Sequence, residues 1–267
     1  MRILAAFGSI LFAHHLAVAA AVAPRAATQD ELQALHDALH RTADDLRRWA
    51  YTEHRVFLDN KGRVKSDHLI RYDPSKPYPE QWTPLAIDGK EPGERERARY
   101  RRRGEQAAAD PARNHLQVGG RDSRRVSLGE VLDVPRSSVA AETGSHWVFE
   151  IPLLKVGNER FPPEKFQVQA RIRKEGVQLE NISVRLRESF RSKLILKVKS
   201  GEGSIDFEAV DPKHPPTMVR ISGDASASVL FISVGGSIEL KRTELKRVRP
   251  FDERFEVQIG TLKAIDF

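Results

Sequence analysis

The segment FQVQARIRKEGVQLENISVRL, residues 166–186, carries the pattern that decides the fold. Apolar and polar side chains alternate in both of its halves, and Lys174-Glu-Gly176 between them is typical of a turn. A period of two indicates β-strands with one buried face. Because the connection is short, these two strands are expected to be antiparallel.

The same alternation continues along the chain on both sides of this segment. Each strand has one apolar face and one basic or polar face, so we expect a sheet that is covered on one side only. A sheet of this width curls. Ser200-Gly-Glu-Gly203 is interpreted as a turn. Strands are expected at 50–58, 63–72, 82–87, 166–172, 182–186, 194–198, 205–209, 218–221, 228–234, 237–241 and 255–259.

An amphipathic helix is predicted at about 29–48. Thr28-Gln-Asp-Glu31 is a capping box, in which the threonine hydroxyl and the glutamate carboxylate satisfy backbone groups at a helix start. Leu32, Leu35 and Leu39 then follow at helical spacing, and the opposite face is charged. Such a helix is a natural cover for the apolar face of the sheet. The expected fold class is mainly β with helices, or α+β.

The N-terminus is typical of a cleaved signal peptide. Residues 1–23 combine a basic start with an apolar run and small residues, and cleavage after Ala19 or after Ala23 fits the pattern. A transmembrane anchor is the alternative. The chain has no cysteine, which excludes a lipid-bearing N-terminus, a disulfide scaffold and a thiolate metal site. We therefore expect a soluble protein of the periplasm that has no nucleic-acid partner.

The remaining 24–267 are expected to form one β domain with an Arg-rich helical insert at about 92–126. The chain has 267 residues and a net charge of +7, and six arginines lie between Arg95 and Arg103. One interpretation is a solvated helix followed by a loop. The other is a patch for an anionic membrane surface or an acidic partner. The candidate residues of this patch are Arg97, Arg99, Arg101, Arg102 and Arg103.

Three segments resemble the LolA/LolB family of periplasmic lipoprotein carriers. LRRWAYTEHRVFLDNKGRV, from Leu46, is similar to the helix exit and first hairpin of that family, and RYDPSKPYPEQWTPLAIDGK, from Arg71, is similar to its strand, proline loop and Asp-Gly-Lys turn. FQVQARIRKEGVQLENISVRL resembles its later hairpin. The missing cysteine makes the chain more similar to the soluble carrier. The insert at 92–126 and the strands after 216 depart from the family pattern.

The resemblance implies an unclosed antiparallel β-barrel with a helix lid. Its concave apolar face would take up acyl chains of a lipid or an acylated lipoprotein, and in this family an arginine of the early sheet holds the lid, for which Arg71 or Arg55 is the counterpart. A monomer is expected, with envelope proteins or an anionic membrane as further partners. The candidate lining residues, which would otherwise be ordinary core, are Val168, Ala170, Ile172, Ile182, Val184, Leu186, Leu194, Leu196 and Phe207.

No motif indicates an enzyme or a cofactor. His36 and His40 have a spacing that can bind zinc, but the glutamate of the metalloprotease pattern is missing, so they are interpreted as surface histidines. No Gly-x-Ser-x-Gly sequence occurs. The alternative function on the same fold is an envelope-stress sensor or another protein-interaction module, which would have a filled core.

Overall fold

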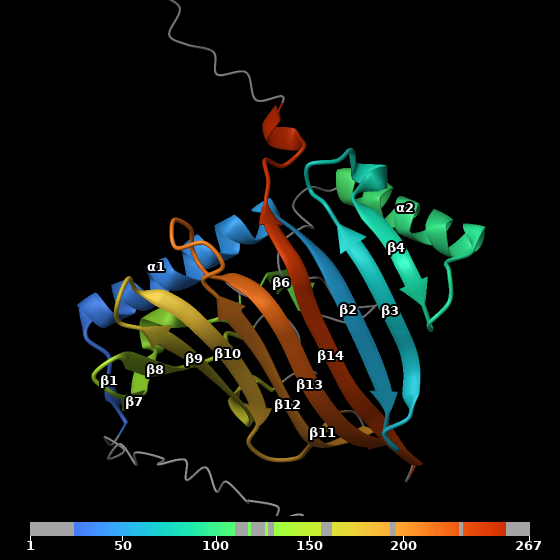
Figure 1. Cartoon of the computed structure of the whole chain (residues 1–267). Coiled ribbons are helices and arrows are strands. Elements are labelled where there is room, and N and C mark those ends of the chain that lie inside the picture. The colour runs from blue at the N-terminus through green and yellow to red at the C-terminus, as the bar shows by residue number, and fades with distance from the viewer. Residues whose placement is uncertain are drawn as a thin grey trace, which may run out of the picture.

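The computed structural model describes residues 24–109, 117–118, 126–127, 131–155, 162–192, 196–229 and 232–254. Its main feature is a 12-stranded sheet with the order β1-β7-β8-β9-β10-β12-β13-β14-β2-β3-β4, in which β11 pairs with β12 off this path. The strand pairs are antiparallel, and β1 and β4 form the two ends of the described sheet (Figure 1). An unclosed antiparallel sheet with two helices is therefore confirmed.

The strands of the main sheet are β1 (Arg25–Ala26), β2 (Trp49–Asp59), β3 (Val64–Tyr72), β4 (Trp82–Ile87), β7 (Ser138–Glu142), β8 (His146–Ile151), β9 (Phe166–Arg173), β10 (Gln178–Leu186), β11 (Phe190–Ser192), β12 (Leu196–Glu208), β13 (Thr217–Val229) and β14 (Ile232–Arg247). A separate pair is formed by β5 (Gln117–Val118) and β6 (Val126–Ser127). The helices are α1 (Gln29–Asp45) and α2 (Glu94–Ala109).

The C-terminal strands are longer than the sequence pattern predicts. The expected turn at Ser200-Gly-Glu-Gly203 is wrong, because these residues lie inside β12, and the short segments expected after 216 belong to the two long strands β13 and β14. The strand expected at 255–259 lies outside the described residues. Gly235 and Gly236 lie inside β14 and do not end it. A Cβ atom at either position would overlap a carbonyl oxygen of a neighbouring strand, that of Ala225 or that of Leu58. These glycines allow close strand packing instead of a turn.

Directly opposed residues of antiparallel strands lie on the same face of a sheet. Register therefore places Ile182, Ile205, Ile221, Leu240 and Arg55 on one face, in a row from β10 to β2. The hydrophobic core lies on this face toward β10, and its buried members are Leu35, Ala38, Leu132, Val139, Phe149, Ile151, Val168, Ala170, Ile172, Leu179, Ile182, Phe207 and Met218.

Helix α1 begins as its capping box predicts. The Thr28 hydroxyl accepts a hydrogen bond from the Glu31 backbone N–H, and the Thr28 N–H donates to the Glu31 carboxylate at 2.8 Å. Leu35 and Ala38 of α1 belong to the core cluster, and the last predicted turn is a short 3-10 helix, Leu46–Arg48. In Figure 1, α1 lies toward the β7–β10 part of the sheet.

Helix α2 packs at the other end of the sheet, beside β4 (Figure 1). Tyr100 is its buried side chain, and its hydroxyl lies 3.2 Å from Nδ1 of His68 on β3. Helix α2 contacts the backbone of Tyr78 at Gly104. A Cβ atom at this position would overlap the Tyr78 carbonyl group, so the contact requires glycine. Of the expected insert at about 92–126, the helical part is thus Glu94–Ala109.

Candidate functional site

Five of the nine predicted lining residues are core residues. Val168, Ala170, Ile172, Ile182 and Phe207 are at most 5% exposed and belong to one cluster with Leu35 and Ala38 of α1. In this structure they line no open cavity, since α1 side chains pack with them.

The other four predicted lining residues lie farther along the strands. Val184 is 36% exposed and Leu186 is half-buried, so neither is part of the closed core. Leu194 lies outside the described residues, and Leu196 is described only as the first residue of β12. The apolar face is therefore filled near Ile182 and open near Val184.

An apolar row crosses the sheet next to the filled core. Register aligns Val184, Gly203, Gly223, Ile238 and Phe57, and the face is the one that carries α1. Phe57 and Ile238 are half-buried, and the side chains of Val184 and Ile238 pack against Gly203 and Gly223. We call these five residues the apolar row. It spans four inter-strand steps, or about 19 Å at a strand spacing of about 4.8 Å.

The two arginines predicted to hold a helix lid have other partners. Arg71 donates to the Thr52 hydroxyl at 3.3 Å and to the Glu244 carbonyl oxygen at 3.3 Å, and Arg55 donates to the carboxylate of Glu53. These partners lie on β2 and β14 and not on α1. The contact expected between Arg71 or Arg55 and the N-terminal helix is therefore absent from the described structure.

Helix α1 is held at its start by Arg25. This side chain donates to both carboxylate oxygens of Glu31, at 2.8 and 2.6 Å, and to Glu142 of β7 at 2.6 Å. The hydrogen bonds from Arg25 lower the pKa of Glu31 to about 2. Lys174 first, and Arg25 second, lower the pKa of Glu142 by hydrogen bonding. The first turn of α1 is thus tied to the sheet by ion pairs.

Two further residues of α1, Arg41 and Asp45, hold the rest of the helix. Arg41 donates to the Val177 carbonyl oxygen in the β9–β10 turn at 2.9 Å. Asp45 accepts from Nε1 of Trp49 and from Arg247 of β14, both at 2.8 Å. Three arginines thus hold this helix to the sheet, namely Arg25 of β1, Arg41 of the helix itself and Arg247 of β14. No sequence motif distinguishes these residues from other surface charges.

The five arginines of the predicted anionic-surface patch separate into two groups. Arg97 pairs with Glu91 at 2.7 Å and Arg101 pairs with Glu94 at 2.9 Å, on the exposed side of α2. Arg99, Arg102 and Arg103 instead line a groove of about 890 Å³ between α2 and the β2–β3 hairpin. The predicted patch is therefore two surfaces of different character.

We call this space the basic groove. Its lining includes Arg55, Lys65 and His68 of the sheet, which the sequence does not connect with the Arg-rich segment. None of the described lining residues is acidic. The complete lining is Arg55, Phe57, Lys65, Ser66, His68, Arg99, Tyr100, Arg102, Arg103 and Gln106.

Aromatic residues lie beside Arg103 of the groove. The Arg103 guanidinium lies 3.8 Å from the centre of the Trp82 ring, and Trp82 in turn contacts Tyr72. Desolvation, and after it the charge of Arg55, lower the pKa of Arg103 from its ordinary value. Burial likewise raises the pKa of Tyr100. Of the cations that line the groove, Arg55 is half-buried, and Lys65, Arg99, Arg102 and Arg103 are exposed.

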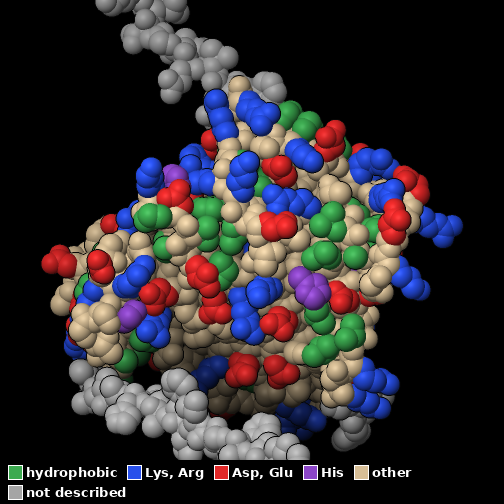
Figure 2. All heavy atoms as spheres, in the orientation of Figure 1, with side chains coloured by type: hydrophobic (Ala, Val, Ile, Leu, Met, Phe, Trp, Pro, Cys, Tyr) green, Lys and Arg blue, Asp and Glu red, His purple; other side chains and the backbone are tan. Residues whose placement is uncertain are grey.

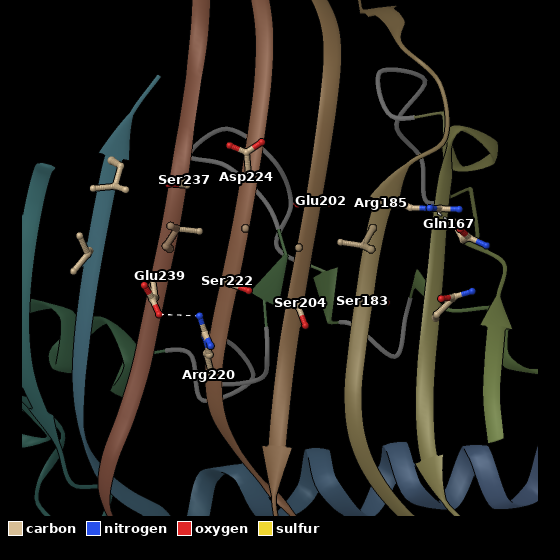
Figure 3. A pocket seen from close by; sticks show the side chains of 17 residues that line it. Gln167, Ser183, Arg185, Glu202, Ser204, Arg220, Ser222, Asp224, Ser237 and Glu239 are labelled. Carbon is tan, nitrogen blue, oxygen red and sulfur yellow. Dashed lines mark hydrogen bonds and ion pairs between the residues drawn. The ribbon is translucent and has the colours of Figure 1, made fainter. Parts of the chain in front are cut away.

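A second groove, of about 460 Å³, is lined mostly by residues of the opposite, polar face of the sheet, and also by Val184, Gly203, Gly223 and Ile238 of the apolar row. Figure 2 shows this face as hollowed, with acidic and basic side chains mixed on it. Side chains from β10 to β14 point into the groove, and Arg220 pairs with Glu239 at 3.0 Å (Figure 3). Its described lining residues include serines but no histidine, so they contain no serine–histidine pair of the kind that nucleophilic catalysis uses. Its mixed charges favour no single ligand.

His36 and His40 stack on each other on the exposed face of α1. Each lies beside an aspartate, Asp37 or Asp44. In the described part of the chain, no three histidine, aspartate or glutamate side chains are placed to hold a metal ion. The described helices also include none with the length and apolar character of a membrane span.

Residues 1–23, where the signal peptide is predicted, lie outside the described residues. Comparison with known proteins identifies no relative, since no protein-family model, no curated protein and no solved structure matches this chain.

Proposed function

We propose that this protein is a periplasmic binding or carrier protein for lipid or acylated lipoprotein. The observation that carries the proposal is the apolar row, which lies on the helix-bearing face and keeps Val184 36% exposed. An acyl chain extends about 15 Å, half the thickness of a bilayer core. The row, at about 19 Å, is long enough to hold one such chain.

The energetics of acyl burial fit a carrier. Each methylene group removed from water contributes about 0.8 kcal/mol, so a chain that is only partly covered is still held in transit. Helix α1 is the proposed lid, because it packs on the apolar face of the sheet beside the apolar row. Its ties are the ion pairs of Arg25 and Asp45, one hydrogen bond from Arg41 and the packing of Leu35 and Ala38.

Native mass spectrometry of the full chain, purified gently from its host, tests this proposal. We expect retained species that fragment into acyl-chain masses. A neutral pyrene-labelled fatty alcohol is the second probe. Val184→Asp places a charge in the apolar row and should reduce uptake of the alcohol, whereas Val210→Asp changes a loop valine that is 44% exposed and should not. An unliganded protein that also fails to take up the alcohol contradicts the carrier function.

The second candidate is a protein-interaction module, such as an envelope-stress sensor. It is favoured by the burial of Val168, Ala170, Ile172, Ile182 and Phe207 in a filled core. In that case Val184 would contact a partner protein, and neither acyl species nor alcohol uptake would be observed.

A further inference from the structure

We propose that the basic groove between α2 and the β2–β3 hairpin is a binding site for a phosphate group, and that in the carrier function it takes the phosphate of an anionic lipid. The assignment to a lipid phosphate rests on the proposed function, whereas the phosphate site itself does not. Five cationic side chains converge on the groove from two separate segments, namely Arg55, Lys65, Arg99, Arg102 and Arg103.

The charge in the groove is only partly compensated. Glu53 lies next to it, fully buried, but its two carboxylate oxygens are shared between Arg55 and Arg242. Arg99 and Arg102 are described without a carboxylate partner, in contrast to Arg97 and Arg101 on the same helix. Like charges that are held together without counter-ions are unfavourable, and a bound anion removes this cost.

A buried donor also lacks an acceptor at this place. Nε of Arg55 is buried and has no hydrogen-bond partner among the described residues, while the other end of its guanidinium donates to Glu53. Unpaired buried donors are rare and costly. Phosphate oxygens accept charge-assisted hydrogen bonds from guanidinium groups, so phosphate is the group that suits both the unpaired donor and the excess charge.

The position of the groove connects phosphate with an acyl chain. Phe57 is the last residue of the apolar row and also lines the basic groove, and Ser66, opposite Phe57 on β3, lines the groove as well. The apolar row and the groove are therefore contiguous on one face of the sheet. A ligand that has an anionic head and an apolar tail would contact both surfaces.

Calorimetric titration of the full chain with inorganic phosphate tests the site without any lipid. The groove variant is Arg99→Gln/Arg102→Gln, and the matched control is Arg97→Gln/Arg101→Gln, which removes the same charge from the outer side of the same helix. We expect the Kd for phosphate to rise at least about tenfold in the groove variant, since two charge-assisted hydrogen bonds are lost. In the control we expect less than about a twofold change, because its arginines face outward.

Pyrene-labelled phosphatidylglycerol and the matching neutral diacylglycerol identify the source of the phosphate. A preference for phosphatidylglycerol that disappears in the groove variant alone supports a lipid headgroup. Phosphate binding without such a preference supports a soluble phosphate ester and removes the lipid half of the proposal. An equal loss in both double variants, or phosphate binding that neither variant changes, overturns the site. Failure of the fatty-alcohol test leaves the phosphate titration unaffected, so the two proposals fail separately.

Discussion

Glu31→Gln isolates the ion pair that ties the start of α1 to the sheet. Glutamine at this position still accepts the hydrogen bond from the Thr28 N–H, so the capping box survives, but the charge that pairs with Arg25 is lost. We expect a lower free energy of unfolding at pH 6, because two short hydrogen bonds from a guanidinium to a carboxylate become weaker neutral ones.

The size of this effect follows from the pKa of Glu31. The pKa is lowered from 4.5 to about 2, chiefly by the hydrogen bond from Arg25. At about 1.4 kcal/mol per pH unit, this lowering corresponds to ~3 kcal/mol before solvent screening. Arg25 is 36% exposed, so screening by water reduces the expected loss to about 1–2 kcal/mol.

Because the pKa of Glu31 is lowered in the folded protein, the sign of the pH dependence of stability is fixed. A carboxylate with a lowered pKa contributes stability above its unfolded value of 4.5, and this contribution is lost as the pH falls toward 2. Urea denaturation at pH 6 and pH 3 should therefore show a wild-type advantage over Glu31→Gln that shrinks by more than half at pH 3. Glu105→Gln, which removes the charge of an exposed glutamate on α2, is the control. If acidification destabilises wild type and Glu31→Gln equally, the Arg25–Glu31 pair does not stabilise α1.

Two other substitutions test the packing of the fold. Leu35→Ala removes the fully buried leucine by which α1 contacts the core, and should lower the free energy of unfolding by about 2–5 kcal/mol in chemical denaturation; a loss below about 1 kcal/mol would mean that α1 hardly packs on the sheet. Gly236→Ala places a Cβ against the Leu58 carbonyl of β2 at a φ of 152°, and should lower the melting temperature, whereas Gly144→Ala, in open space, should not.

The strand pattern was predictable because it depends on local alternation. Residues 166–186 form the β9–β10 hairpin, and its turn lies where Lys174-Glu-Gly176 predicts it. Strand length was not predictable. Glycines in β12 and β14 suggest breaks between strands by composition, but they lie inside long strands. Gly235 and Gly236 of β14 lie where neighbouring backbones approach closely, and this depends on partner strands that are distant in sequence.

The candidate site shows the same limit. Hydrophobic alternation identified Val184 as a lining residue, but it does not distinguish Val184, which is 36% exposed, from Ile182 on the same face, which is buried in the core. The Arg-rich segment was visible as a charge cluster, but Lys65 and Arg55 join it only because α2 folds back over the first hairpin. The contact of Gly104 with Tyr78 sets that approach, and a single glycine in an arginine-rich helix gives no signal of it.

The arginines of α2 are exposed, as in a solvated helix, but Tyr100 and Gly104 of the same helix are buried. If α2 only shielded the end of the sheet, its inward side would be apolar, as Tyr100 is. Arg99, Arg102 and Arg103 line the basic groove, while Glu91 and Glu94 pair with Arg97 and Arg101. This distribution concentrates positive charge at the end of the apolar row. A surface of that composition is better suited to an amphiphile with an anionic head than to a purely apolar ligand.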